Sequence, residues 1–181
     1  GNMTPPDLVI YHGNCADGFA AAWALRYFMG EHNVEYFAGT YNEPPPDVTD
    51  RFVTLVDFSY PRAVIEEMLK KATHVTILDH HKSAHLDLIG LTAPNFNPIF
   101  DMERSGAQMA FDYASAGLGK RPTLIDHIGD RDLWKFKLPR TKEIAAAVFS
   151  YPYDFKVWDT LMVMPIDDLA DEGSHILRKH R

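Results

Sequence analysis

The amino-acid sequence predicts an α/β fold with a parallel sheet of about five strands, helices on both faces of the sheet, and a mostly helical C-terminal part. Two observations support this class. In the first part of the chain, short apolar runs alternate with helical segments, which is the order of strands joined by crossover helices in a parallel sheet. Beyond Ser105 the pattern becomes mostly helical.

Five segments have the length and apolar character of buried strands. They cover residues 8–11, 34–38, 52–56, 74–78 and, more briefly, 98–100. Between the second and third segments, three successive prolines predict an extended loop over residues 42–47.

The remaining segments have helical character. Residues 19–29 are rich in Ala and other helix formers, and Gly30 is a plausible stop. Pro61 suits the first turn of a helix that continues over residues 63–72. Beyond Ser105, helices are predicted over residues 106–116, 123–128, 142–149, 155–162 and 167–177.

Composition limits the function classes. The chain has 181 residues, 46 % of them hydrophobic, which is enough for one domain with a sizeable core and excludes wholesale disorder. A formal net charge of −7 argues against a polycation that coats nucleic acid. Cys15 is the single cysteine, so a cytoplasmic protein is expected, and no apolar run is long enough to predict a membrane span.

Three predicted strands end in residues that bind metal ions or transfer protons. The first, third and fourth strands lead, in order, to His12 with Asp17, to Asp57, and to the run Asp79, His80 and His81. Taken singly, His12 could be a loop hydrogen-bonder, Asp17 a good N-cap for the next helix, and Asp57 a cap of the turn before Pro61. The run Asp79, His80 and His81 is costly to bury unless it binds something. Because ligands bind beyond the carboxyl ends of parallel strands, the shared position favours one common site.

The residue types at these strand ends indicate a particular metal chemistry. Mixed imidazole and carboxylate ligands suit Mn²⁺, Fe²⁺ or Zn²⁺ rather than Ca²⁺, and a structural zinc site is not expected without paired thiols. In a two-metal centre, one carboxylate bridges the ions and bound water is acidified to hydroxide. Such centres hydrolyse phosphate esters and anhydrides.

Four segments carry a resemblance to a known family: residues 11–18, 55–58, 77–81 and 128–134. With these segments the chain resembles the DHH phosphoesterase superfamily, which is named for the Asp-His-His motif found here at Asp79, His80 and His81. The resemblance is to its nano-RNase and exopolyphosphatase-like branch in particular. The resemblance implies two Mn²⁺ ions, with Mg²⁺, Fe²⁺ or Co²⁺ as alternatives, and a small phosphate-containing substrate such as a short oligonucleotide.

The resemblance also implies roles for single residues. His12 would bind one metal, Asp17 and His80 the other, and Asp57 would bridge the two. Asp130 would complete the second site, with Asp132 as its rival, and Arg131 would point away if Asp130 points in. His81 would face the phosphate, and Asp79 would orient a neighbouring imidazole. Ser105 is expected as an N-cap, with phosphate binding as the functional alternative.

Two departures from the family pattern stand out. Cys15 occupies the place of an expected carboxylate, where it would be either a thiolate ligand or a buried apolar residue. Residues 1–165 would form the phosphoesterase domain and residues 166–181 the start of a linker helix, while nothing in the chain matches the second, substrate-binding domain. Trp134, Phe136, Phe149 and Trp158 could stack bases or serve in the core.

The expected function is therefore a Mn²⁺-dependent hydrolase of a nucleotide-type phosphodiester or phosphoanhydride. The alternatives are a pyrophosphatase or exopolyphosphatase with the same metals, and a non-catalytic nucleotide- or metal-binding module. A homodimer is an alternative to a monomer.

Overall fold

A computed structural model describes residues 4–180 and confirms the predicted α/β class. Its centre is a five-stranded parallel sheet with the order β2-β1-β3-β4-β5. The strands are β1 (Leu8–His12), β2 (Glu35–Gly39), β3 (Phe52–Val56), β4 (His74–Asp79) and β5 (Phe96–Phe100). Strand β1 lies between β2 and β3, so the chain continues from β1 to one side and later to the other side, and the crossover helices fall on both faces.

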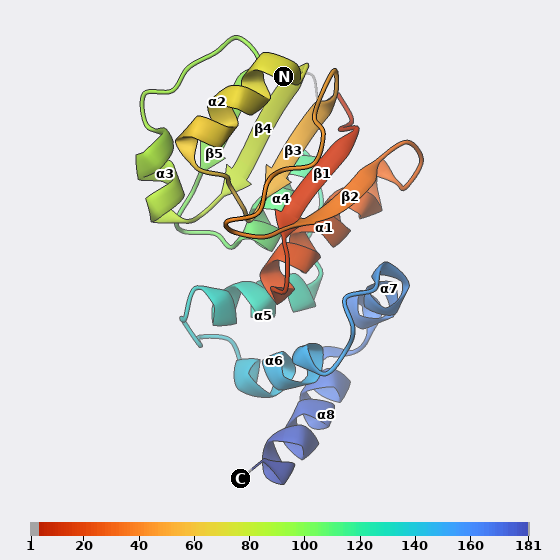
Figure 1. Cartoon of the computed structure of the whole chain (residues 1–181). Coiled ribbons are helices and arrows are strands. Elements are labelled where there is room, and N and C mark those ends of the chain that lie inside the picture. The colour runs from red at the N-terminus through yellow and green to blue at the C-terminus, as the bar shows by residue number, and fades with distance from the viewer. Residues whose placement is uncertain (1–3, 181) are drawn as a thin grey trace.

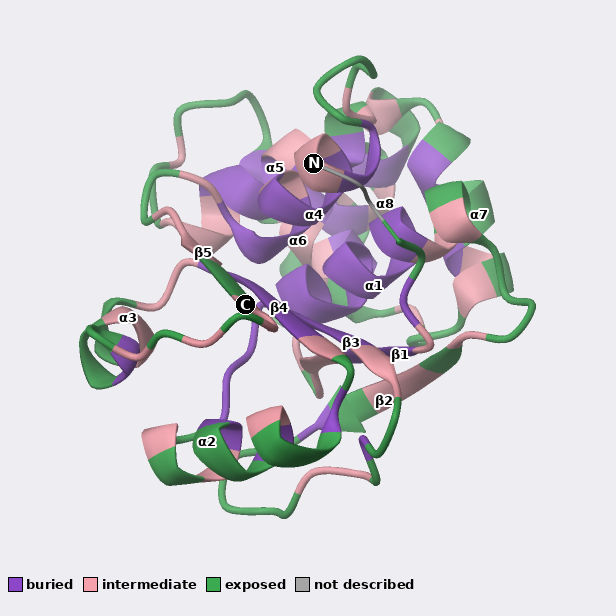
Figure 2. Ribbon diagram, turned by 90° about the horizontal axis from the view of Figure 1, so that it is seen from above, coloured by how far each residue is buried: buried purple, intermediate pink, exposed green. Residues whose placement is uncertain are grey.

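Two pairs of helices cover the sheet (Figure 2). Helices α1 (Ala16–Met29) and α4 (Gly106–Ala114) pack on one face, and α2 (Arg62–Lys71) and α3 (Lys82–Leu88) lie on the other side. Successive strand residues point to opposite faces, so Val9 joins the core under α1 and α4, while Leu8 and Ile10 join the core under α2. All three side chains are fully buried.

Four further helices form a layer beyond the carboxyl ends of the strands (Figure 1). They are α5 (Thr123–Asp132), α6 (Thr141–Phe149), α7 (Phe155–Val163) and α8 (Ile166–Lys179). Helix α8 crosses α6 so closely that a Cβ on Gly173 would lie within 1.6 Å of the Glu143 carbonyl oxygen. The strands run toward this layer, so residues at their carboxyl ends face α5 and α6.

The structure differs from the sequence prediction in one helix that was not predicted and in the bounds of several elements; for example, α1 begins earlier, at Ala16. Residues 82–88 form α3, where no helix was predicted; this helix has seven residues, and Leu88 is its one buried residue. Strand β5 begins earlier, at Phe96. Helix α5 continues past Ile128 to Asp132, which changes where its acidic residues point. Between residues 4 and 180, no helix is long and apolar enough to cross a membrane.

Candidate metal centre

The ends of β1, β3 and β4 meet at the edge of the sheet that faces α5. Potential ligand atoms within 4.8 Å of one another form three overlapping groups. The groups are His12 with Cys15 and Asp57; Asp57 with Asp79, His80 and His81; and Asp17 with His80 and Asp132. The structure thus brings together the strand-end residues that the sequence singled out.

Asp57 lies at the centre of the cluster and is shared by two of these groups. Its Oδ1 lies 2.8 Å from His80 Nε2, and its Oδ2 lies 3.5 Å from His12 Nδ1 and accepts a 3.6 Å hydrogen bond from Cys15 Sγ. The two oxygens therefore face different ligand groups, as in a bridging carboxylate. Burial opposes ionisation of Asp57, but the imidazoles of His12 and His80 lower the pKa of its carboxyl well below the usual range.

A strained backbone and a close glycine hold Asp57 in place. Asp57 has a left-handed φ of 56°, and its N–H donates to the Leu78 carbonyl oxygen at 2.9 Å. A Cβ on Gly106 would lie 2.4 Å from the Asp57 Cβ and 2.7 Å from its Oδ1. Gly106 is thus a residue of the centre that the sequence reasoning missed; its only signal was a glycine directly after the N-cap Ser105.

Asp17 does not cap its own helix. The N-cap of α1 is Cys15, and the Asp17 carboxylate instead accepts hydrogen bonds from the backbone N–H groups of Gly106 (2.8 Å) and Ala107 (3.0 Å). These N–H groups begin α4, so the positive end of that helix supports the buried carboxylate. Gly18 lets α1 approach β1, because a Cβ there would lie 2.3 Å from the His12 carbonyl oxygen.

Three carboxylates surround the His80 imidazole. Besides Asp57, Asp132 Oδ2 lies 3.3 Å and Asp17 Oδ2 lies 3.5 Å from His80 Nε2. Burial, reinforced by the negative charge of Asp57, raises the pKa values of both Asp17 and Asp132. So many acidic groups in a buried space repel one another unless a cation lies between them.

Asp130 does not join the cluster, which corrects the expectation that it completes the second site. Its carboxylate accepts hydrogen bonds from the N–H groups of Lys137 (2.9 Å) and Leu138 (3.0 Å) and from the Thr141 hydroxyl (2.6 Å). These contacts fasten the turn between α5 and α6. Asp132, two residues later on the same helix, faces the other way and lies beside His80.

Asp79 and His81 form a hydrogen-bonded pair beside the cluster. Asp79 Oδ1 accepts from His81 Nδ1 at 2.6 Å and from the His80 backbone N–H at 2.8 Å. This pairing raises the pKa of His81 to about 9. Asp79 thus contacts the neighbouring imidazole of His81, and within residues 4–180 the other ring nitrogen of His81, Nε2, makes no hydrogen bond.

Ser105 is the N-cap of α4. Its Oγ accepts from the Gln108 N–H at 3.3 Å, the Gln108 side chain accepts from the Ser105 N–H, and the residue is fully buried. The next backbone N–H groups are also engaged, because Gly106 and Ala107 donate to Asp17. The structure therefore shows Ser105 as the buried cap of α4.

The cluster fits a divalent metal centre. His12 Nδ1 and Asp79 Oδ2 are buried and make no hydrogen bond within the described part of the chain. Such unpartnered atoms are costly unless they bind something. Imidazole nitrogens with carboxylate oxygens are a donor set for Mn²⁺, Fe²⁺ or Zn²⁺, and the Cys15 sulfur adds a softer donor on the side of His12. Burial and the charge of Asp57 raise the pKa of this thiol to about 12.

Comparison with known proteins gives a fold and a distant relative. No protein-family model matches the chain. An uncharacterized protein of Acanthamoeba polyphaga mimivirus is 30 % identical over 189 residues, which cover 96 % of this chain and 44 % of the viral protein. The chain thus spans less than half the length of that curated relative. The crystal structure of an uncharacterized protein from Helicobacter pylori G27 matches with a TM-score of 0.55 at 12 % identity, over 94 % of this chain and 69 % of that chain, which shows a shared fold.

Proposed function

We propose that this protein is a metal-dependent hydrolase of phosphate esters or anhydrides with a two-metal centre. One observation carries the proposal: the two oxygens of Asp57 face two separate ligand groups, one containing His12 and the other His80. A carboxylate in that position is what two adjacent divalent ions require. The resemblance of the chain to the DHH phosphoesterase superfamily supports the same chemistry.

The ligand groups divide between two ions. His12, Cys15 and one oxygen of Asp57 would hold the first ion. Asp17, His80, Asp132 and the other oxygen of Asp57 would hold the second. When bound, such ions acidify a shared water and neutralise charge on a phosphoryl group; Mn²⁺ is the expected metal.

The His81–Asp79 pair would supply a hydrogen-bond and proton donor for the substrate. Asp79 fixes the imidazole through Nδ1, so Nε2 can donate a hydrogen bond to a phosphoryl oxygen or to a leaving oxygen. The rings of His81 and His12 lie 6.1 Å apart between centroids, which places the donor beside the first ligand group. Binding, orientation and proton donation thus come from neighbouring strand ends.

Metal content and turnover of Asp57→Asn test the proposal. This nearly isosteric change removes the bridging charge, so the variant is expected to lose both ions and all hydrolysis. Asp154→Asn is the matched control, because the Asp154 side chain caps α7 far from the ligand groups in sequence, and Asn is an equally good cap. Protein is loaded with Mn²⁺, its metal content is measured, and phosphate release from pyrophosphate and cleavage of a labelled dinucleotide are followed.

The outcomes separate the alternatives. Cleavage of pyrophosphate alone would favour the pyrophosphatase alternative. Bound Mn²⁺ without turnover of either substrate would overturn the hydrolase and favour a binding module. Full metal content and rate in Asp57→Asn would overturn the two-metal centre itself.

A further inference from the structure

The two ligand groups of the candidate centre differ in their donor atoms. Around His12, the donors are its imidazole nitrogen, the Cys15 sulfur and one oxygen of Asp57. Around His80, the other donors are all carboxylates, those of Asp17, Asp57 and Asp132. Carboxylate-rich sites suit Mn²⁺ and Mg²⁺, whereas a thiolate selects softer ions such as Zn²⁺. The two sides of the centre therefore offer different chemistry to metal ions.

The distances around His12 match those between the ligands of a tetrahedral zinc ion. Zinc binds sulfur at about 2.3 Å and nitrogen or oxygen at about 2.0–2.1 Å, so at tetrahedral angles two such ligand atoms lie about 3.3–3.6 Å apart. Asp57 Oδ2 lies 3.6 Å from Cys15 Sγ and 3.5 Å from His12 Nδ1. The nitrogen and the sulfur also lie within 4.8 Å of each other. One ion therefore fits among the three atoms with little movement of the side chains.

The position of Cys15 in its helix gives the sulfur no structural role. Cys15 is the N-cap of α1, where Ser, Thr, Asp or Asn would be preferred, and its side chain makes no capping hydrogen bond. The thiol donates to Asp57 Oδ2 instead. A bound ion would replace the thiol proton, which leaves to solvent, and the positive end of α1 favours the thiolate that remains.

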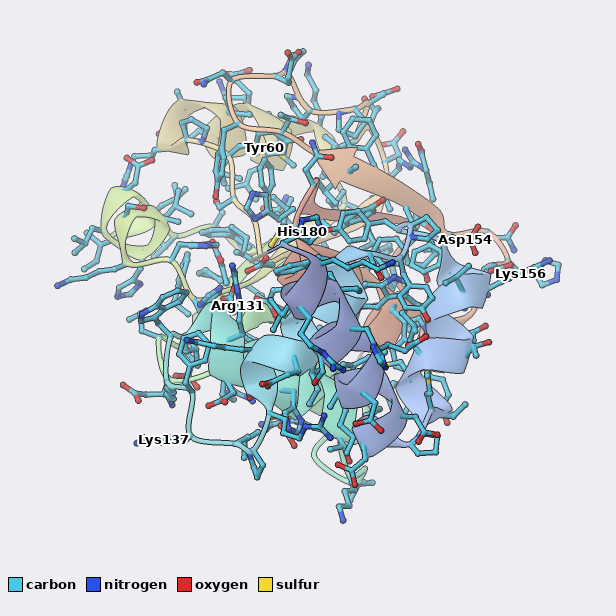
Figure 3. All side chains as sticks on the ribbon, turned by 90° about the horizontal axis from the view of Figure 1, so that it is seen from below. Tyr60, Arg131, Lys137, Asp154, Lys156 and His180 are labelled. Carbon is cyan, nitrogen blue, oxygen red and sulfur yellow. The ribbon has the colours of Figure 1, made fainter. Side chains whose placement is uncertain are left out.

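Two further observations indicate an ion at this side. His12 Nδ1 is buried and makes no hydrogen bond within residues 4–180, although it faces Asp57. A cavity of about 490 Å³ opens beside the group, and His12, Cys15 and Arg131 are among the residues that line it. In Figure 3, Arg131 marks the position of this cavity near the middle of the molecule. Three protein ligands next to an open space are the arrangement of a catalytic zinc ion rather than of a structural one.

We propose that the centre holds two different ions, with Zn²⁺ bound by His12, Cys15 and Asp57 and Mn²⁺ bound by the ligand group around His80. The inference rests on the proposed two-metal centre and assigns an ion to each of its sides. Zn²⁺ binds a given nitrogen or oxygen site more tightly than Mn²⁺ does, and sulfur widens that difference. Limited Zn²⁺ therefore fills the side with sulfur first, and the side without sulfur is left to Mn²⁺.

Cobalt(II) is the probe for the sulfur side, because it replaces Zn²⁺ in tetrahedral sites and a cobalt–thiolate bond absorbs in the near ultraviolet. One equivalent of Co²⁺ is added to the metal-free protein, followed by one equivalent of Mn²⁺. Since Cys15 is the single cysteine, a cobalt–sulfur band has one source. The band is expected with Co²⁺ alone, and it should persist while Mn²⁺ also binds. Bound Co²⁺ without the band, or displacement of Co²⁺ by Mn²⁺, would overturn the proposal.

Three variants assign the ions to their sides. Cys15→Ser keeps the size of the side chain and a good N-cap, and it is expected to lose the cobalt–sulfur band and the preference of this side for Zn²⁺ over Mn²⁺. Asp132→Asn is expected to keep the band and to lose Mn²⁺. Asp154→Asn is the matched control and should keep both, because Asp154 caps α7 and lies at the periphery in Figure 3. An unchanged Zn²⁺ preference in Cys15→Ser, measured as metal content after dialysis against both ions, would refute selection by sulfur.

Failure of this inference is distinguishable from failure of the proposed function. Hydrolysis with Mn²⁺ by a protein that shows no cobalt–sulfur band would overturn the mixed centre and leave the hydrolase in place. The band, with Mn²⁺ bound beside Co²⁺ but without turnover of phosphate esters or anhydrides, would support the mixed centre and overturn the hydrolase. A protein that binds no Co²⁺ would overturn the mixed centre.

Discussion

Gly106→Ala places a single methyl group against the centre of the proposed metal site. The added Cβ would lie 2.4 Å from the Asp57 Cβ, and real Cβ contacts essentially never fall below 3.0 Å, so α4 or Asp57 must move by at least about 0.6 Å. The substitution keeps the backbone N–H that Asp17 accepts, so the effect is steric. Overpacking of this kind costs about 1–3 kcal/mol, which lowers the Tm of a chain of this length by about 2–12 °C.

The same displacement is expected to weaken Mn²⁺ binding, because misplaced supporting groups typically reduce metal affinity about 10- to 100-fold. Thermal unfolding with chelator present measures the stability change alone, and calorimetric titration with Mn²⁺ measures the affinity. Gly119→Ala is the control, since that glycine is exposed and its added Cβ would come no closer than 3.2 Å to another atom. A Gly106→Ala protein with wild-type Tm and Mn²⁺ affinity would show that the close packing against Asp57 has no role.

Five other substitutions, in three comparisons, test separate parts of the structure. Asp132→Asn is expected to lose Mn²⁺ affinity. Asp130→Asn is expected to keep Mn²⁺ affinity but to lose about 1–3 kcal/mol of stability, because Asp130 accepts hydrogen bonds from Thr141 and two N–H groups. Mn²⁺ titration and urea denaturation of both variants measure these effects, and the reverse pattern would restore Asp130 as the ligand. Cys15→Asp is expected to bind Mn²⁺ more tightly than the wild type, because Mn²⁺ prefers oxygen to sulfur, and Cys15→Ala is expected to bind Mn²⁺ more weakly. Equal metal content in the wild type and both variants would show that Cys15 is a packing residue. Burial of Asp112 opposes its ionisation, but hydrogen bonds from two arginines lower its pKa below the ordinary 3.8. Asp112→Asn should therefore cost about 1 kcal/mol at pH 7, and urea denaturation should show this difference shrinking as the pH falls through the lowered pKa; a constant difference from pH 7 to pH 3 would contradict this.

The sequence predicted the three inner strands β1, β3 and β4 well because most of their residues are buried on both faces of the sheet. Continuous apolar runs such as Phe52–Val56 have few alternatives to a central parallel strand, and β3 has those same bounds. Helix α3 escaped prediction because one buried residue, Leu88, produces no periodic pattern. Local patterns are thus informative in proportion to the number of side chains that an element buries.

The sequence predicted the cluster residues that follow the ends of strands, but it did not settle which carboxylate on helix α5 joins the cluster. His12, Asp57 and His80 follow from the parallel order of the strands. The choice between Asp130 and Asp132 depends on the phase of α5, and that helix continues beyond its predicted end at Ile128. Residues two positions apart on a helix point in nearly opposite directions, so the register decides which carboxylate reaches the centre.

The Asp17 carboxylate has two roles in the structure. It accepts hydrogen bonds from the first N–H groups of α4, and it also borders the His80 imidazole. A knock-out at this position would therefore confound loss of activity with loss of folding, and inactive Asp17 variants in a mutational screen would say little about chemistry. Conversely, an ion bound to this carboxylate is coupled through it to the first turn of α4, so a change in amide exchange at Gly106 and Ala107 would report metal occupancy.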